Sequence, residues 1–202
     1  MKALGKGSIA SIVRVGLQIA WIVLWVAAGF IMLGAIAYAV ILGLIANGAV
    51  DPEFLRGGDG QIHVGDDGGD FSVQYDSAAG ATWPVVIPAL LIGAVAVAGS
   101  LVIVWRLKKL FDSFSSGEPF RRENAVHLRV IWMTMLVIEV SRYVLMGVTA
   151  FLLARFGEGA RQISISIDGD RIAAWGSILI LIVLAEVFRE GARMKEEQEL
   201  TI

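Results

Sequence analysis

The sequence predicts an all-α integral membrane protein with four transmembrane helices and a small extracytoplasmic β-element formed by its two outer loops. Three observations lead to this prediction. The 202 residues are 56% hydrophobic, with a mean hydropathy of +0.72. Four long apolar segments occur along the chain, and the loops between them alternate in the sign of their charge. Since about 20 apolar residues cross a bilayer core as a helix, we expect one membrane domain.

The four spans are expected at residues 15–46, 84–105, 130–154 and 172–188. The first two contain no charged residue, and the first is too long to be the apolar region of a signal peptide. The third is interrupted by Glu139 and Arg142. The fourth is short, so Arg171 and Arg189 at its ends are expected to reach toward the two interfaces.

The distribution of basic residues predicts the orientation. Twelve Lys and Arg residues fall in the amino-terminal segment, the loop 106–129 and the tail 189–202, against four in the loops 47–83 and 155–171. Cytoplasmic flanks of membrane helices retain Lys and Arg. Both termini and the middle loop are therefore expected in the cytoplasm, and the other two loops outside it.

Three short stretches of the outer loops alternate apolar and polar residues, as half-buried strands do. They are residues 61–64, 71–75 and 162–168, and they predict a sheet that joins the two loops. Its expected apolar face consists of Ile62, Val64, Phe71, Val73, Tyr75, Ile163, Ile165 and Ile167. The turn at 65–70 is rich in Gly and Asp, which suits a hairpin. Calcium binding there is the alternative to a solvated turn, although the spacing differs from an EF-hand.

Glu139 and Arg142 are the candidate polar pair inside the membrane. Each charge costs about 2.5–3.5 kcal/mol to insert at a helix centre, and their spacing of three places them on one helical face. A structural ion pair facing other helices is one interpretation, and a proton or ion relay is the other. A transporter would usually also show broken helices or an inverted repeat, and the sequence has little of either.

The helix of the second span is expected to continue through Arg106 to Phe114, stop near Gly117 and resume after Pro119. The tail is expected to extend the fourth span. Candidate residues for a cytoplasmic interaction are Phe120, Arg121, Arg122, Asn124, Arg129, Glu186, Arg189, Glu196 and Glu197. The basic loop is not evidence for direct nucleic-acid binding, because membrane topology already accounts for its charge.

Two segments carry a resemblance to a known family. Residues 110–120, Leu-Phe-Asp-Ser-Phe-Ser-Ser-Gly-Glu-Pro-Phe, followed by Glu123-Asn124 and Leu128-Arg129, resemble the middle loop of the bacterial membrane family called domain of unknown function 2975. Residues 184–191, Leu-Ala-Glu-Val-Phe-Arg-Glu-Gly, and the final Leu200-Thr201-Ile202 are similar to its carboxy-terminal signature. Gln198 stands where that signature leads us to expect asparagine.

The resemblance implies four transmembrane helices, a bacterial cytoplasmic (inner) membrane and no established activity. Members are often encoded beside a small helix-turn-helix regulator, which implies such a soluble regulator as a partner. We expect a non-enzymatic sensor or regulatory protein that acts by protein–protein interaction, with the lipid bilayer as its other partner. The alternatives are an accessory subunit of a larger membrane complex and a small transporter or channel using Glu139 and Arg142. No cofactor or catalytic residue is predicted.

Overall fold

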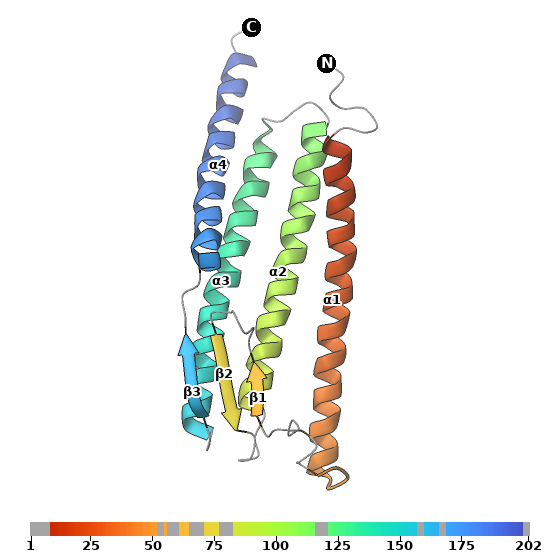
Figure 1. Cartoon of the computed structure of the whole chain (residues 1–202). Coiled ribbons are helices and arrows are strands. Elements are labelled where there is room, and N and C mark those ends of the chain that lie inside the picture. The colour runs from red at the N-terminus through yellow and green to blue at the C-terminus, as the bar shows by residue number, and fades with distance from the viewer. Residues whose placement is uncertain are drawn as a thin grey trace. The chain divides into compact units, whose positions relative to one another are not determined.

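The computed structural model describes residues 9–51, 55, 61–64, 71–76, 83–115, 121–156, 160–165 and 169–199. Its elements follow the order α1 (Ile9–Ala46), β1 (Gln61–Val64), β2 (Phe71–Asp76), α2 (Trp83–Ser115), α3 (Arg122–Phe156), β3 (Ala160–Ile165) and α4 (Gly169–Glu199) (Figure 1). The chain forms two compact units. Unit 1 comprises residues 1–27, 97–138 and 173–202, and unit 2 comprises residues 28–96 and 139–172.

All four helices are long and apolar enough to span a membrane. The shortest, α4, has 31 residues, which is about 46 Å of helix against a hydrocarbon core of about 30 Å. This confirms the predicted fold class, a multi-pass membrane protein with four spanning helices. The helices also run past the predicted spans. The continuation of α2, expected to Phe114, is confirmed and reaches Ser115. The expected restart after Pro119 is confirmed with α3 beginning at Arg122, and the extension of α4 into the tail is confirmed as far as Glu199.

The ends of the helices have local causes. Gly48 adopts a positive φ of 70°, a conformation that costs glycine least. This residue closes α1, because its N–H donates to Ile45 O at 3.0 Å and the N–H of Ala49 donates to Leu44 O at 2.9 Å. That pair of bonds is a Schellman motif. At the start of α2, Pro84 lies in the first turn, where its missing N–H breaks no helical bond.

The three strands form one antiparallel sheet in the order β1-β2-β3. Val73 is the register partner of Val64 on one side and of Ile163 on the other, and a bulge interrupts the β2–β3 pairing near Gln74. The sheet joins the two predicted loops, as the alternation predicts. The third strand spans Ala160–Ile165, and the remaining predicted residues, 166–168 with Ile167, lie outside the described residues. Packing by an apolar face of the sheet stays a prediction.

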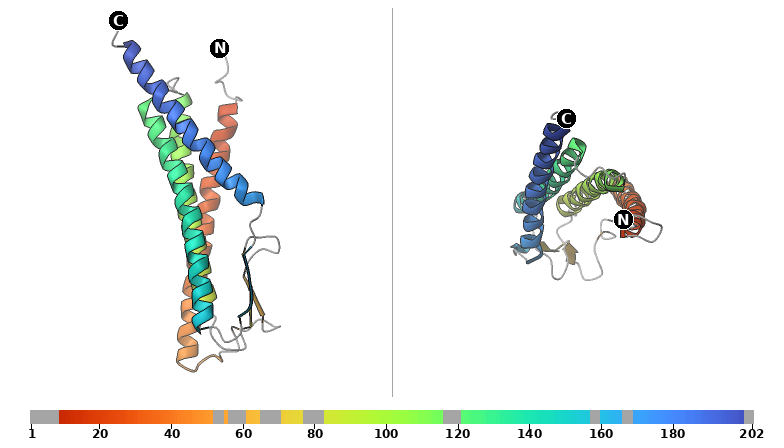
Figure 2. Two further views of the ribbon diagram at one scale, coloured as in Figure 1. Left: turned by 90° about the vertical axis from the view of Figure 1, so that its left-hand side faces the viewer. Right: turned by 90° about the horizontal axis from the view of Figure 1, so that it is seen from above.

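The core of unit 1 joins α2, α3 and α4 through the buried residues Leu110, Leu128 and Ala185. Leu107, Phe114, Trp132, Leu181 and Phe188 pack around these three, and the rings of Phe114 and Phe188 stack with centroids 5.8 Å apart. In this unit α4 crosses α2 and α3 obliquely (Figure 2). The core cluster therefore holds α4 against α2 and α3 around Ala185.

Helix α1 is in contact with the rest of the protein through one narrow face. From residue 12 to residue 46 no side chain is buried, and the half-buried positions recur every three or four residues, beginning with Val13, Leu17, Ala20 and Leu24. Its other faces expose large apolar side chains such as Ile19, Val23 and Phe30. A spanning helix with exposed apolar faces is matched to lipid rather than to water.

Unit 2 has its own buried residues. Val85 on α2 and Met146, Thr149 and Leu153 on α3 are buried, and the rings of Trp83 and Phe156 lie 5.4 Å apart. Thr149 satisfies its hydroxyl locally by donating to Leu145 O at 2.8 Å. Unit 2 thus ties the start of α2 to the end of α3.

Candidate functional site

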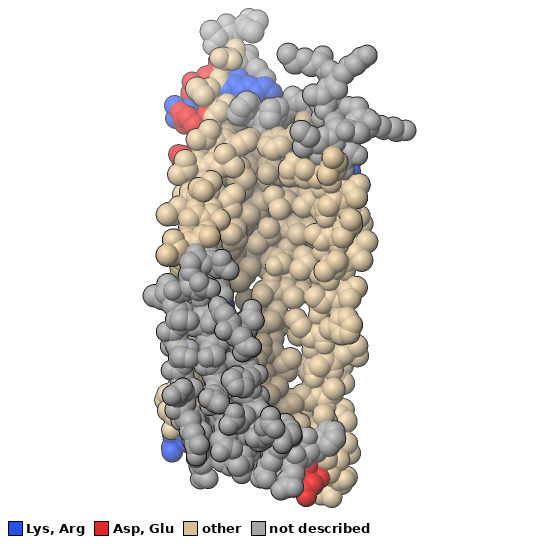
Figure 3. Space-filling model, in the orientation of Figure 1, with Lys and Arg blue, Asp and Glu red and all other residues tan. Residues whose placement is uncertain are grey.

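Among the described residues, polar side-chain contacts between helices gather in one part of unit 1, which we call the charged end. It consists of residues 9–21 of α1, 105–115 of α2, 122–132 of α3 with the preceding Arg121, and 182–199 of α4. Figure 3 shows blue and red atoms gathered where α4 ends. Two grooves open at the charged end, one between α1 and α2 and one between α3 and α4.

The α1–α2 groove is small, about 190 Å³, and is lined by Arg14, Leu17, Gln18, Lys108, Phe111 and Asp112. Its polar groups are paired across the two helices. Arg14 Nη2 donates to Asp112 Oδ1 at 2.9 Å, and Lys108 Nζ donates to Gln18 Oε1 at 2.8 Å. The same ammonium lies 4.9 Å from the centroid of the Trp21 ring, within cation–π range. The charged groups that line this groove are therefore already paired with side chains of the facing helix.

Contacts between α2 and α3 are partly buried. Asn124 is 1% exposed, and its Nδ2 donates to Ser113 Oγ at 2.9 Å. Arg106 Nη1 lies 3.2 Å from His127 Nδ1. A guanidinium can only donate, so Nδ1 must accept and the proton of this neutral imidazole belongs on Nε2. These contacts fix the start of α3 against α2.

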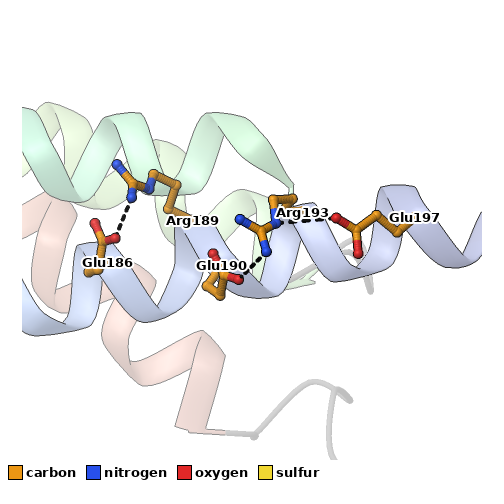
Figure 4. A network of polar contacts seen from close by, with 5 residues as sticks. All are labelled: Glu186, Arg189, Glu190, Arg193 and Glu197. Carbon is orange, nitrogen blue, oxygen red and sulfur yellow. Dashed lines mark hydrogen bonds and ion pairs between the residues drawn. The ribbon is translucent and has the colours of Figure 1, made fainter.

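Helix α4 carries a ladder of charges along its own surface (Figure 4). Arg189 contacts Glu186. Arg193 lies between two acids, with Nη2 2.9 Å from Glu190 Oε1 and Nε 3.2 Å from Glu197 Oε1. Pairs three or four residues apart stabilise an isolated helix by about 0.2–0.5 kcal/mol each. They support the helical conformation of the tail.

The α3–α4 groove is larger, about 450 Å³, and differs in its charge. Its lining residues are Arg122, Ala125, Val126, Arg129, Trp132, Ile182, Ala185, Glu186 and Arg189. Ala125 and Ala185 are buried, and these small side chains leave space between the helices. Glu186 is the only acid among the described residues that line the groove, and it contacts Arg189. Among the described residues, neither Arg122 nor Arg129 forms an ion pair or a hydrogen bond through its side chain.

The structure brings some of the predicted interaction residues together. Arg122, Arg129, Glu186 and Arg189 meet at the α3–α4 groove, whereas Asn124 is buried against α2. Glu196 and Glu197 lie on the exposed end of α4, and Arg121 directly precedes α3. Phe120 lies outside the described residues.

Sequence reasoning missed the α1–α2 contacts. Arg14 and Asp112 are 98 residues apart, and Gln18 and Lys108 are 90 apart. Arg14 and Lys108 enter the sequence prediction only as markers of orientation. No local pattern links residues at such separations, so the sequence gives no signal for these pairs.

The intramembrane candidates occupy different environments. Glu139 is buried on α3, and Arg142 is half-buried, with its guanidinium 5.8 Å from the ring centroid of Tyr143. Their role as a structural pair or as a relay stays a prediction. The acidic turn considered for calcium, residues 65–70, lies outside the described residues. Among the residues that are described, no three His, Cys, Asp or Glu side chains form a metal-binding cluster.

Comparison with protein-family models identifies a match. A family model described as a protein of unknown function, DUF2975, matches residues 69–202. No curated protein and no solved structure matches the chain. The matched region contains α2, α3 and α4, and with them the α3–α4 groove and the charge ladder of α4. It covers about two thirds of the 202 residues, and the chain belongs to the DUF2975 family.

Proposed function

We propose that this protein is a non-enzymatic sensor or regulatory protein of the bacterial cytoplasmic membrane that binds a soluble protein partner through the end of α4. The observation that carries the proposal is the exposed helical end of α4. From residue 193 to residue 198 every side chain is exposed, yet the segment is helical. A helical end held by ion pairs and surrounded by solvent is available to another protein.

The chemistry of this end supports a protein partner. Arg193 holds Glu190 and Glu197 along the helix, and Met194 presents an exposed apolar side chain between these charges. Isolated helical segments of this length are marginal in water, so the ion pairs preorganise the surface before binding. Preorganisation lowers the entropic cost of association.

The orientation that we propose places both termini in the cytoplasm. Lys and Arg are concentrated in the segments at the charged end, and cytoplasmic flanks of spanning helices retain them. The end of α4 is then on the side where a soluble helix-turn-helix regulator, the partner suggested by family analogy, would be found. Analogy at the family level identifies a class of partner and no specific protein.

The test compares proteins that co-purify from native membranes in mild detergent. The wild-type chain is set against a deletion of residues 195–202 and against Glu196→Gln with Glu197→Gln. Asp51→Asn with Glu123→Gln removes the same two negative charges elsewhere and is the matched control. We expect a soluble regulator in stoichiometric amount with the wild type and the control, a weaker signal with the Gln pair and none with the deletion.

Two other outcomes would replace this proposal. Stoichiometric membrane chains that persist after the deletion would make the protein an accessory subunit. The exposed apolar faces of α1 favour this second candidate, because they offer a long surface to another spanning helix.

A preparation without any stoichiometric partner would direct attention to transport through Glu139 and Arg142. In that case Glu139→Gln should abolish a proton or ion flux in proteoliposomes while leaving expression of the protein unchanged. The burial of Glu139 on α3 is the observation that supports this third candidate.

A further inference from the structure

The α3–α4 groove has a chemical gradient along its length. Arg122 and Arg189 line the part of the groove near the start of α3 and the last turns of α4, whereas Trp132 and Ile182 line the part nearer the apolar middle of both helices. One turn beyond Ile182, Leu179 is also exposed and apolar. A ligand that fills this groove has an anionic part and an apolar part.

The arginines specify the anionic part. Arg122 and Arg129 are two turns apart on the same face of α3, about 10 Å along the axis, so both guanidinium groups can approach one anion from opposite ends. Glu186 offsets the charge of Arg189, which leaves two positive charges in the lining. Guanidinium groups bind phosphate oxygens through paired charge-assisted hydrogen bonds.

The position of the groove specifies the apolar part. Trp residues favour the membrane interface, where one edge of the indole is apolar and the other is wet. Basic pockets between spanning helices at that level bind lipid headgroups. Ala125 and Ala185 are buried and line the groove with small side chains, which leaves room there for a headgroup.

We propose that the α3–α4 groove binds an anionic glycerophospholipid, with its phosphate between Arg122 and Arg129 and an acyl chain passing Trp132 and Ile182. A free phosphate would use only the arginine end of the groove, and an acidic peptide would leave the apolar end empty. Residues 193–198 take no part in this site, so the lipid proposal is independent of the partner proposed for α4.

The experiment measures lipid binding to the full-length chain by native mass spectrometry. The protein is titrated with phosphatidylglycerol and, separately, with phosphatidylcholine. The variant is Arg122→Gln with Arg129→Gln. The matched control is Arg14→Gln with Arg155→Gln, which removes two arginines from outside the groove. Circular dichroism and size-exclusion chromatography verify that each variant is folded.

In the wild type we expect phosphatidylglycerol to bind more tightly than phosphatidylcholine. The groove variant should lower the affinity for phosphatidylglycerol by about a hundredfold or more, since it removes two charge-assisted contacts and each contributes about tenfold or more. The control should stay within about twofold. Replacing both groove arginines by Lys keeps the charge but removes the planar fork, and an intermediate loss is expected. The Lys pair also keeps the test decisive if the Gln pair does not fold.

Four results would overturn the proposal. If the groove variant and the control lost phosphatidylglycerol affinity equally, the lipid would be attracted by the net positive charge of the protein and not by this groove. Full binding by the Lys pair would likewise show that positive charge alone suffices. Displacement of the lipid by millimolar inorganic phosphate would identify a site for phosphate without acyl chains. Unchanged phosphatidylglycerol affinity in the groove variant, together with loss of a soluble partner, would identify the groove as a protein contact.

Discussion

The α1–α2 groove and the α3–α4 groove lie in the same unit and share one kind of lining, arginine beside apolar side chains, yet they differ in how their charges are used. In the α1–α2 groove Arg14 is paired with Asp112 and Lys108 with Gln18. In the α3–α4 groove Glu186 contacts Arg189, while Arg122 and Arg129 have no ion-pair partner among the described residues. Basic residues that count equally in the prediction of orientation therefore need not make the same kind of contact. Pairing across the helices decides which of them remain available to a ligand.

The two sides of unit 1 also differ in packing. Leu110, Leu128 and Ala185 are buried between α2, α3 and α4, whereas the described part of α1 buries no side chain. Helix α1 is held by one edge and by exposed polar contacts. The α3–α4 side is thus built on a close-packed core, and the α1 side is not.

The largest expected effect comes from removing core volume on the α3–α4 side. Leu128 is 2% exposed, so Leu128→Ala should lower the free energy of unfolding by about 2–5 kcal/mol through lost contacts and a cavity. Leu17 in the α1–α2 groove is half-buried, and Leu17→Ala should cost about 1 kcal/mol. Thermal unfolding in detergent, followed by circular dichroism, measures both. Equal losses would contradict the difference in packing.

A smaller effect is expected from adding one methyl group where α2 meets α3. A Cβ on Gly99 would lie 2.5 Å from Ile138 Cδ1 and 2.7 Å from Ile138 Cγ1, so Gly99→Ala should destabilise the protein by about 1–3 kcal/mol. Gly16 on α1 has nothing within 4 Å of that position. Gly16→Ala should instead stabilise by about 0.5–1 kcal/mol, because glycine weakens a helix interior. The unfolding midpoints of the two variants should shift in opposite directions. Shifts in the same direction would contradict the difference in packing between the two positions.

The smallest effect is expected at the exposed pair of the α1–α2 groove. The side chains of Arg14 and Asp112 are 67% and 66% exposed, so solvent and salt screen their attraction. A double-mutant cycle with Arg14→Gln and Asp112→Asn should give a coupling of about 0–1 kcal/mol, decreasing as salt is raised. A salt-independent coupling above that range would mean that α1 is held as firmly as α3 and α4.

Much of the fold follows from local sequence. The apolar runs predict all four helices. The continuation of α2, a restart of the helix after Pro119 and a helical tail as far as Glu199 are confirmed. The alternation of apolar and polar residues in the loops 47–83 and 155–171 predicts the sheet that joins them. These features depend on periodicity, length and turn residues within a few positions of one another, so they can be read without the tertiary structure.

The candidate sites were less predictable. The sequence placed Arg122, Arg129, Glu186 and Arg189 in one set of interaction residues, but it did not reveal the groove between them. Nor did it predict the separate environment of Asn124, which is buried and bonded to Ser113. Arg122 and Arg129 lie on the face of α3 that lines the groove, whereas Asn124 lies on the face that contacts α2. A membrane helix has weak amphipathic patterning, because lipid and protein interior are similarly apolar.

By itself, the sequence determined that the chain forms four helices able to span a membrane, and its motifs identified the DUF2975 family. Hydrophobic length and backbone hydrogen bonding fix those features locally. Only the tertiary structure decided that Arg14 meets Asp112, that Leu128 is enclosed with Leu110 and Ala185, and that Ala125 and Ala185 leave a groove beside Arg122 and Arg129. These outcomes depend on the rotation of each helix about its axis, which is set by the packing of side chains distant in sequence.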